Sequence, residues 1–218
     1  MSNLKNWRLI LCNLWLIVNG SACALTIIDK PITFDTQRVE LTKQYIQQHY
    51  KLTPATIEII PRIIVLHWTS TATLQQAFDL FNPVKLPAAR SDLGKGIQVN
   101  VSTQFMVDRD GTIYRLMPET WMARHVIGLN YSAIGIENVG GGTEFDDLTP
   151  KQLAANIALT RYLMQRYPTI TRIIGHYEYP QWVHDPLWLE HDAHYRTVKH
   201  DPGRRFLTAV KAGVKSNR

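Results

Sequence analysis

An apolar run at residues 63–66 is the sequence feature that most restricts how this chain can fold. Two isoleucines, a valine and a leucine follow one another there without a polar residue between them. A short run of this kind, rich in β-branched residues, is typical of a strand buried on both faces of a sheet. The run ends at His67, so we expect a titratable, metal-competent side chain at the end of a rigid central strand. A single histidine at such a place is more often structural. Whether His67 is functional depends on whether other strands also end in polar residues.

Two later segments repeat the arrangement of a short apolar strand followed by a polar residue. Residues 133–136 lead to Glu137, and residues 172–175 lead to His176. Polar side chains at the ends of neighbouring strands commonly gather in one cleft. Asp201 lies in a Lys-His-Asp-Pro-Gly turn before the last predicted helix. Two histidines and a carboxylate form a plausible catalytic zinc site, with water as the fourth ligand.

Such a site would support hydrolysis. Zinc lowers the pKa of its bound water towards neutrality, Glu137 could accept the proton of that water, and Lys199 could stabilise an oxyanion. Spacing alone leaves other histidine triples open, which include His184, His191 and His194. The chain has no G-x-S-x-G turn, P-loop or G-x-G-x-x-G motif, so serine-hydrolase and nucleotide chemistry are unsupported.

The remaining pattern predicts one α/β domain, with a mixed central β-sheet flanked by helices. Residues 27–34 are expected to form an extended arm, residues 82–96 a loop, and residues 105–114 a hairpin that turns at Gly111. Four helices are predicted from apolar stripes and cap residues. The expected starts of these helices are Asp35 or Thr36, Ser70 or Thr71, Thr149, and the turn Pro202-Gly203.

The first 24 residues predict a secretory signal peptide. Lys5 and Arg8 precede an apolar stretch too short to span a membrane, and Ala22-Cys23-Ala24 provides a small-residue cleavage site. We therefore expect a mature domain over residues 25–218, with its core at about 60–214, located in the periplasm or outside the cell. Lipidation at Cys23 is the minority alternative. Both cysteines of the chain fall in the predicted signal, so the mature domain would contain no disulfide.

The formal net charge of the chain is +6, and removal of the predicted signal, which carries two bases and no acids, would leave +6 − 2 = +4. This modest excess is compatible with an anionic polymer surface such as a cell wall, although it is also ordinary for a soluble protein. We expect no nucleic-acid partner, no membrane span in the mature chain, and a monomer.

Four blocks of sequence resemble the zinc-dependent N-acetylmuramoyl-L-alanine amidases of the type 2 family, which share their fold with peptidoglycan recognition proteins. The blocks are IIVLHWTST, VSTQFMVDRDGTIYRLMPE, ARHVIGLNYSAIGIENVGG, and IIGHYEY followed by VKHDPG. The resemblance implies Zn²⁺ bound by His67, His176 and Asp201, with Glu137 and Lys199 as catalytic residues. It also implies a groove for peptidoglycan or muropeptide, and hydrolysis of the amide between N-acetylmuramic acid and L-alanine. The expected substrate-binding residues are Trp68, Arg124, His125 and Asn130, and His125 is equally well explained by a structural role.

The chain departs from the family pattern at three places. Gln104 stands where many members have a histidine, and Arg124 stands where many have a tryptophan, which changes one wall of the groove. Residues 177–198 form a long insert between His176 and Lys199, with Trp182 and Trp188 expected mainly to pack it onto the domain. We expect this insert, which also carries Tyr195, to form one wall of the groove and to set substrate preference. Two alternatives stay open from the sequence: a module of the same fold that binds wall fragments without cleaving them, and a zinc peptidase of the stem peptide.

Overall fold

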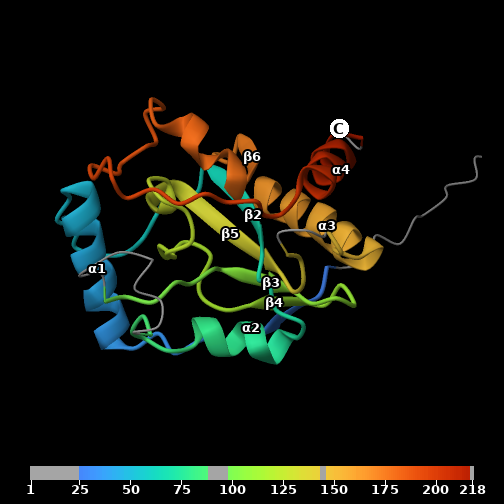
Figure 1. Ribbon diagram of the computed structural model, residues 1–218, viewed down its shortest axis with the longest axis horizontal. Helices are drawn as coiled ribbons and strands as arrows, with labels where there is room; N and C mark the ends of the chain where they lie inside the picture. Colours follow the sequence, from blue (N-terminus) through green and yellow to red (C-terminus); the bar gives the residue numbers. More distant parts are fainter. Residues whose placement is uncertain (1–24, 88–97, 143–145, 217–218) are drawn as a thin grey trace, which may run out of the picture.

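A mixed β-sheet lies at the centre of the computed structural model, which describes residues 25–87, 98–142 and 146–216 (Figure 1). Within these ranges the strand order is β1-β4-β3-β5-β2-β6, and every neighbouring pair is parallel except the β3–β4 hairpin. The strands are β1 (Ile27–Asp29), β2 (Ile63–Trp68), β3 (Phe105–Val107), β4 (Ile113–Arg115), β5 (Ala133–Asn138) and β6 (Arg172–Gly175). The predicted signal peptide and residues 88–97 of the expected loop lie outside the described residues.

The apolar run at residues 63–66 forms the first four residues of β2, which lies between β5 and β6, and these four residues are fully buried. Successive side chains of a strand point to opposite faces of the sheet. Ile64 and Leu66 pack in one cluster with α3 (Pro150–Arg166) and α4 (Arg204–Lys215), whereas Ile63 and Val65 pack in another on the opposite face. Helices therefore cover one face of the central strands, and the site described below lies on the other.

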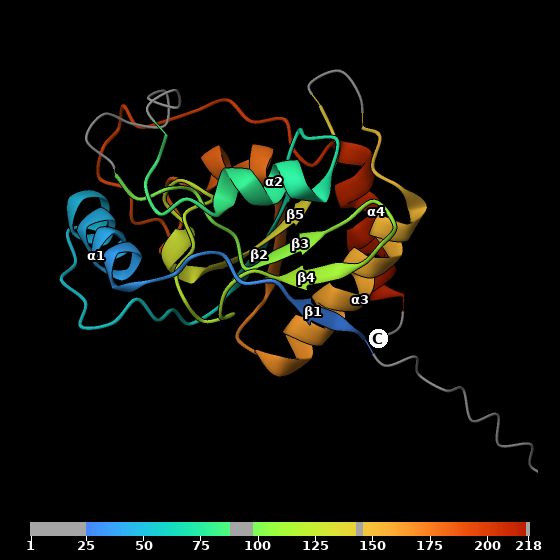
Figure 2. The ribbon, with the colours of Figure 1, turned by 90° about the horizontal axis from the view of Figure 1, so that it is seen from below.

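The helix α2 (Leu74–Phe81) covers the opposite side of the sheet from α3 and α4, as Figure 2 shows. Its N-cap is Thr73, whose hydroxyl accepts a hydrogen bond from the Gln76 backbone N–H, so the expected cap at Ser70 or Thr71 is wrong. Ser70 adopts a left-handed backbone with φ of 54°, and its N–H donates to the Gly140 carbonyl. This contact holds the chain against the strand end and delays the start of the helix.

The other helix starts agree with the sequence. Asp35 caps α1 (Thr36–Tyr50), and Thr149 and Gln152 form the expected capping box of α3. The expected extended arm is partly a strand, because residues 27–29 pair with β4 as β1 at the edge of the sheet. Across the described ranges, none of the helices combines the length and the apolar character needed to cross a membrane.

Arg38 of α1 is fully buried, and its guanidinium binds backbone carbonyl groups of neighbouring segments. Its guanidinium donates to the carbonyl oxygens of Thr33 at 2.7 Å, Phe81 at 2.8 Å and Pro83 at 3.1 Å. Burial lowers the pKa of Arg38 to about 10, which still leaves it charged at neutral pH. These bonds join the start of α1 to the end of α2.

Replacing Arg38 by methionine should therefore destabilise the protein, because the chain length is kept while three backbone carbonyl groups, among them the buried one of Phe81, lose a donor. We expect the free energy of unfolding to fall by on the order of 3 kcal/mol, measured by chemical denaturation. Glu40→Gln on the exposed side of the same helix is the control and should change stability by no more than about 0.5 kcal/mol. An unchanged denaturation midpoint for Arg38→Met would show that these bonds contribute nothing net.

Candidate metal centre and active-site groove

The alternation of β2 directs His67 away from α3 and α4, onto the same face as Val65. In the sheet register His67 lies beside Glu137 of β5, so both side chains emerge at the carboxyl ends of neighbouring parallel strands. His176 directly follows β6 and begins a 3-10 helix, η3 (His176–Trp182). Asp201 lies just ahead of α4 and completes the group.

His67, His176 and Asp201 bring three potential metal-binding atoms together. Nδ1 of His67 lies 2.9 Å from Nδ1 of His176 and 3.1 Å from Oδ2 of Asp201, and the last two atoms are 3.0 Å apart. The residues are 1%, 7% and 8% exposed, respectively. In the described part of the chain this is the one group of three such residues close enough to share an ion. Buried nitrogen and oxygen donors that converge in this way fit a metal ion.

The protonation states also suit metal binding. Burial, reinforced by the nearby His176, lowers the pKa of His67 to about 4, so its ring is neutral at pH 7 and has a lone pair to offer. Burial alone would raise the pKa of Asp201, but the adjacent His176 and His67 bring it below its ordinary value. Asp201 is therefore a carboxylate at neutral pH.

A groove of about 280 Å³ opens over this group. Each of the other predicted site residues lines it, namely Trp68, Arg124, His125, Asn130, Glu137 and Lys199. Glu137 is only 7% exposed, so its carboxylate lies in a low-dielectric part of the groove near His67. The strand-end pattern thus identified side chains that the fold does bring together.

Asn130 and Gln104 have structural contacts in this region. The Asn130 side-chain oxygen accepts hydrogen bonds from the backbone N–H groups of His125 at 2.8 Å and Val126 at 2.7 Å, which fixes the turn beneath the groove. Gln104 accepts from the Gly135 N–H at 2.8 Å and donates to the Trp121 carbonyl at 2.9 Å. Gln104 therefore connects the approach to β3 with β5, away from the three converging donor atoms.

Arg124 is buried at one wall of the groove, where it donates to the Val99 carbonyl and to the Tyr195 hydroxyl, the latter at 3.0 Å. Tyr195 and Thr197 of the insert also line the groove, as does Tyr45 of α1. The sequence predicted that the insert, with Tyr195 among its rings, forms one wall of the groove, but it did not place Thr197 or Tyr45 at the site. The position of the insert between His176 and Lys199 was the available signal for Tyr195, whereas nothing local to α1 indicated Tyr45.

The insert packs onto the domain through its aromatic and buried charged residues. The Trp188 ring lies parallel to the Tyr179 ring, with centroids 6.2 Å apart, and occupies the space in which a side chain on Gly128 would lie. Glu190 contacts His49 of α1 at 2.8 Å, with both side chains buried. His184, His191 and His194 are exposed, and none belongs to the metal-binding group found among the described residues.

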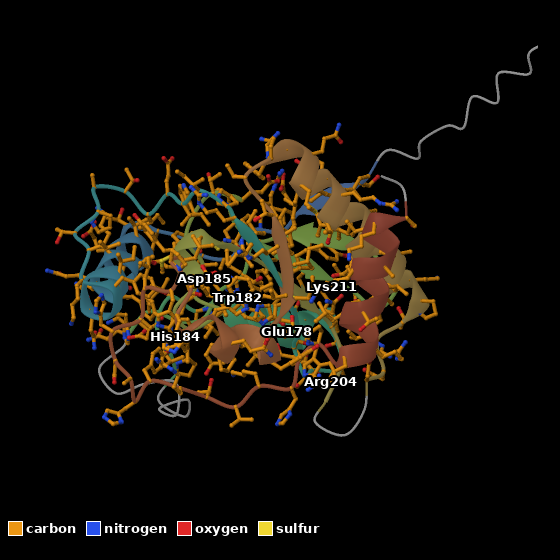
Figure 3. All side chains as sticks on the ribbon, turned by 90° about the horizontal axis from the view of Figure 1, so that it is seen from above. Glu178, Trp182, His184, Asp185, Arg204 and Lys211 are labelled. Atoms are coloured by element: carbon orange, nitrogen blue, oxygen red, sulfur yellow. The ribbon has the colours of Figure 1, made fainter. Side chains whose placement is uncertain are left out.

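The start of the insert also contacts α4. Figure 3 shows Glu178 and Trp182 of η3 on the side of the molecule that carries Lys211, and the Lys211 ammonium lies 3.2 Å from the Glu178 carboxylate. The Arg172 guanidinium of β6 lies over the Trp182 ring, 5.1 Å from its centroid. Trp182 therefore packs beside the sheet edge and, unlike Tyr195, is not part of the groove lining.

Fold and site together define an α/β protein with a candidate metal centre at the carboxyl ends of its central parallel strands. Residues 56–204 match the family described as N-acetylmuramoyl-L-alanine amidase. Because the match spans more than half of the chain, the protein belongs to this type 2 amidase family. The expected mixed sheet with flanking helices is confirmed.

Several solved structures are also similar to this chain. The chain resembles the N-acetylmuramoyl-L-alanine amidase LysC from Clostridium intestinale, with 28% identity and a TM-score of 0.48 over 71% of this chain and 84% of that one. It resembles AmpD with 25% identity and a TM-score of 0.50, again over 71% and 84% of the two chains. Bumblebee PGRP-SA shares the fold at 18% identity and a TM-score of 0.50, over 85% of this chain and 93% of that one. No curated protein matches the chain.

Proposed function

We propose that this protein is a zinc-dependent N-acetylmuramoyl-L-alanine amidase. It hydrolyses the amide between the lactyl group of N-acetylmuramic acid and L-alanine in peptidoglycan or its fragments. The observation that carries the proposal is the convergence of three buried donor atoms within 2.9–3.1 Å of one another at the floor of a groove. Membership of the amidase family supports the choice of bond.

In this proposal His67, His176 and Asp201 hold the zinc ion, since two imidazole nitrogens and one carboxylate oxygen match the ligands of catalytic zinc sites. Bound zinc would supply a Lewis acid and a water of lowered pKa. Glu137 accepts the proton of the attacking water and later delivers it to the departing alanine amine. Lys199 stabilises the negative charge that develops on the carbonyl oxygen. Because Glu137 is buried, fewer water dipoles screen the electrostatic interactions of its carboxylate, which are therefore stronger.

The proposed mature enzyme comprises residues 25–218 after removal of a signal peptide at residues 1–24, and acts in the periplasm or outside the cell as a monomer. The full set of three donors together with Glu137 favours catalysis over a module that only binds wall fragments. Product analysis separates these functions.

The test is incubation of purified protein with a soluble disaccharide-peptide, followed by mass spectrometry. We expect free peptide with an N-terminal alanine and an intact disaccharide, loss of this reaction on chelation, and its return with zinc. Bound zinc without released peptide would identify a binding module instead. Cleavage within the peptide would identify a stem-peptide peptidase.

We further propose that the insert forms one wall of the substrate groove and sets substrate preference. Tyr195 carries this proposal, because its ring lines the groove and its hydroxyl accepts a hydrogen bond from buried Arg124. Tyr195→Ala should weaken activity on polymeric wall roughly two- to tenfold, since an aromatic contact contributes about 0.5–1.5 kcal/mol. The loss on a small muropeptide should be smaller.

The matched control for this prediction is His194→Ala, because His194 is an exposed neighbour in the same insert. It should leave both rates unchanged. Equal losses on polymer and fragment in Tyr195→Ala would mean that Tyr195 only supports the fold of the insert.

A further inference from the structure

His125 contacts His67 on the side of the ring that faces away from the other donors. Nε2 of His67 lies 2.9 Å from Nδ1 of His125, whereas Nδ1 of His67 is the atom close to His176 and Asp201. The two rings are nearly perpendicular, at 85°, with centroids 5.0 Å apart. His125 is itself only 8% exposed. Its contact with the candidate metal centre is therefore made at the Nε2 side of His67.

Two features of the fold position the His125 ring: a hydrogen bond of its backbone and a glycine beside it. The Asn130 side chain accepts a hydrogen bond from the His125 backbone N–H at 2.8 Å. Gly135 lies beneath the ring, next to Val65 in the register, and a Cβ at Gly135 would come within 3.0 Å of the His125 ring atoms Cγ and Nδ1. A glycine at this strand position leaves room for the imidazole beside His67.

The position of the ring proton decides whether His67 can bind a metal. A metal ion takes the lone pair of the nitrogen it binds, so Nδ1 of His67 must then carry no proton. A neutral imidazole carries its proton on one nitrogen only, so this proton must sit on Nε2. The group that faces Nε2 at 2.9 Å is Nδ1 of His125, which must then be an acceptor. With the opposite arrangement, His125 would donate to Nε2 and the proton of His67 would point at the metal position.

We propose that His125 is a positioning residue of the metal centre, which accepts a hydrogen bond from Nε2 of His67 and thereby fixes the tautomer of His67 that binds metal. The proposal deepens the proposed function and rests on its metal site. It places the proton of His125 on Nε2, the other ring nitrogen, which is buried. Nδ1 of His125 is then free to accept from Nε2 of His67 at 2.9 Å.

Zinc affinity, measured by competition with a chromophoric chelator, tests the proposal without reference to catalysis. His125→Ala should weaken zinc binding by about 10–100-fold, as loss of a partner to a ligating histidine typically does. His125→Asn should recover most of this affinity, because the δ oxygen of asparagine takes the place of Nδ1 as the acceptor. Gly135→Ala should weaken binding in the same direction, since it displaces the ring without removing it. Thermal unfolding of the zinc-free variants verifies that each one is folded.

Long-range ¹H–¹⁵N correlation spectra of the zinc-loaded wild-type protein read the tautomers directly. We expect a proton on Nε2 of both His67 and His125, with Nδ1 of His125 unprotonated. A histidine with a structural role alone would not require an unprotonated Nδ1 facing His67. A proton on Nδ1 of His125 would overturn the proposal.

The affinity results separate the possible failures. Equal zinc affinity in wild type and His125→Ala, or no recovery in His125→Asn, would overturn the role of His125 while leaving the metal site intact. Failure of the wild-type protein to bind zinc would instead overturn the metal site itself, and the proposed function with it.

Discussion

Replacing either His67 or His176 by alanine should remove both the bound zinc and the amidase activity. Each residue supplies one of the three buried donors, and a centre with two remaining protein ligands no longer has the set found in catalytic zinc sites. We expect about one zinc per wild-type chain and close to none in either variant, measured by elemental analysis after dialysis. Activity should fall to the background of the uncatalysed reaction.

His184→Ala is the matched control, because this histidine is exposed and lies outside the cluster of donors. It should retain both zinc and activity. Full activity of His67→Ala in a sample verified to be free of metal would rule out the assigned centre. Loss of zinc in His184→Ala would show that a histidine of the insert is a ligand.

Replacing Glu137 by glutamine should slow the reaction by about 10²–10⁴-fold, the range that a general base typically contributes. Glutamine keeps the shape of the side chain but cannot take the proton of the attacking water. Because Glu137 lies beside His67 in the register without belonging to the group of three donors, zinc content should stay near the wild-type value. The measurement is kcat on a soluble muropeptide together with zinc stoichiometry.

Glu40→Gln controls for the chemical change alone, since Glu40 is exposed on α1, and it should leave kcat unaltered. Loss of zinc in Glu137→Gln would mean that Glu137 is a ligand or a determinant of the local fold. A wild-type rate with zinc retained would assign the proton transfer to another group.

The parts of the fold that could be predicted from sequence follow from local rules. The run ending at His67 is apolar on both faces, so only a buried central strand accommodates it, and its two-residue period determines the face on which His67 emerges. Glu137 near the end of β5 and His176 directly after β6 obey the same rule, which explains why both lie near His67. The helix caps at Asp35 and Thr149 are likewise determined by a side chain and a backbone three residues away.

The features that were missed depend on contacts between distant segments. The start of α2 shifts to Thr73 because Ser70 is bound to Gly140, a residue 70 positions further along the chain. Tyr45 reaches the groove because of how α1 packs, and no pattern within α1 encodes that position. The contact of His125 with His67 also required the glycine at position 135, whose role is visible only once the strands are paired. In each case tertiary packing supplies the information.

The position of an oxygen label tests the central claim most directly. Hydrolysis in ¹⁸O-labelled water adds one labelled oxygen to the acyl carbon of the cleaved amide, and mass spectrometry of the products locates it. If this protein cleaves the bond between N-acetylmuramic acid and L-alanine, the label should appear in the lactyl carboxylate of the sugar product, and the released peptide should carry none. Label in a carboxylate of a peptide product, with L-alanine still attached to the sugar, would contradict the account.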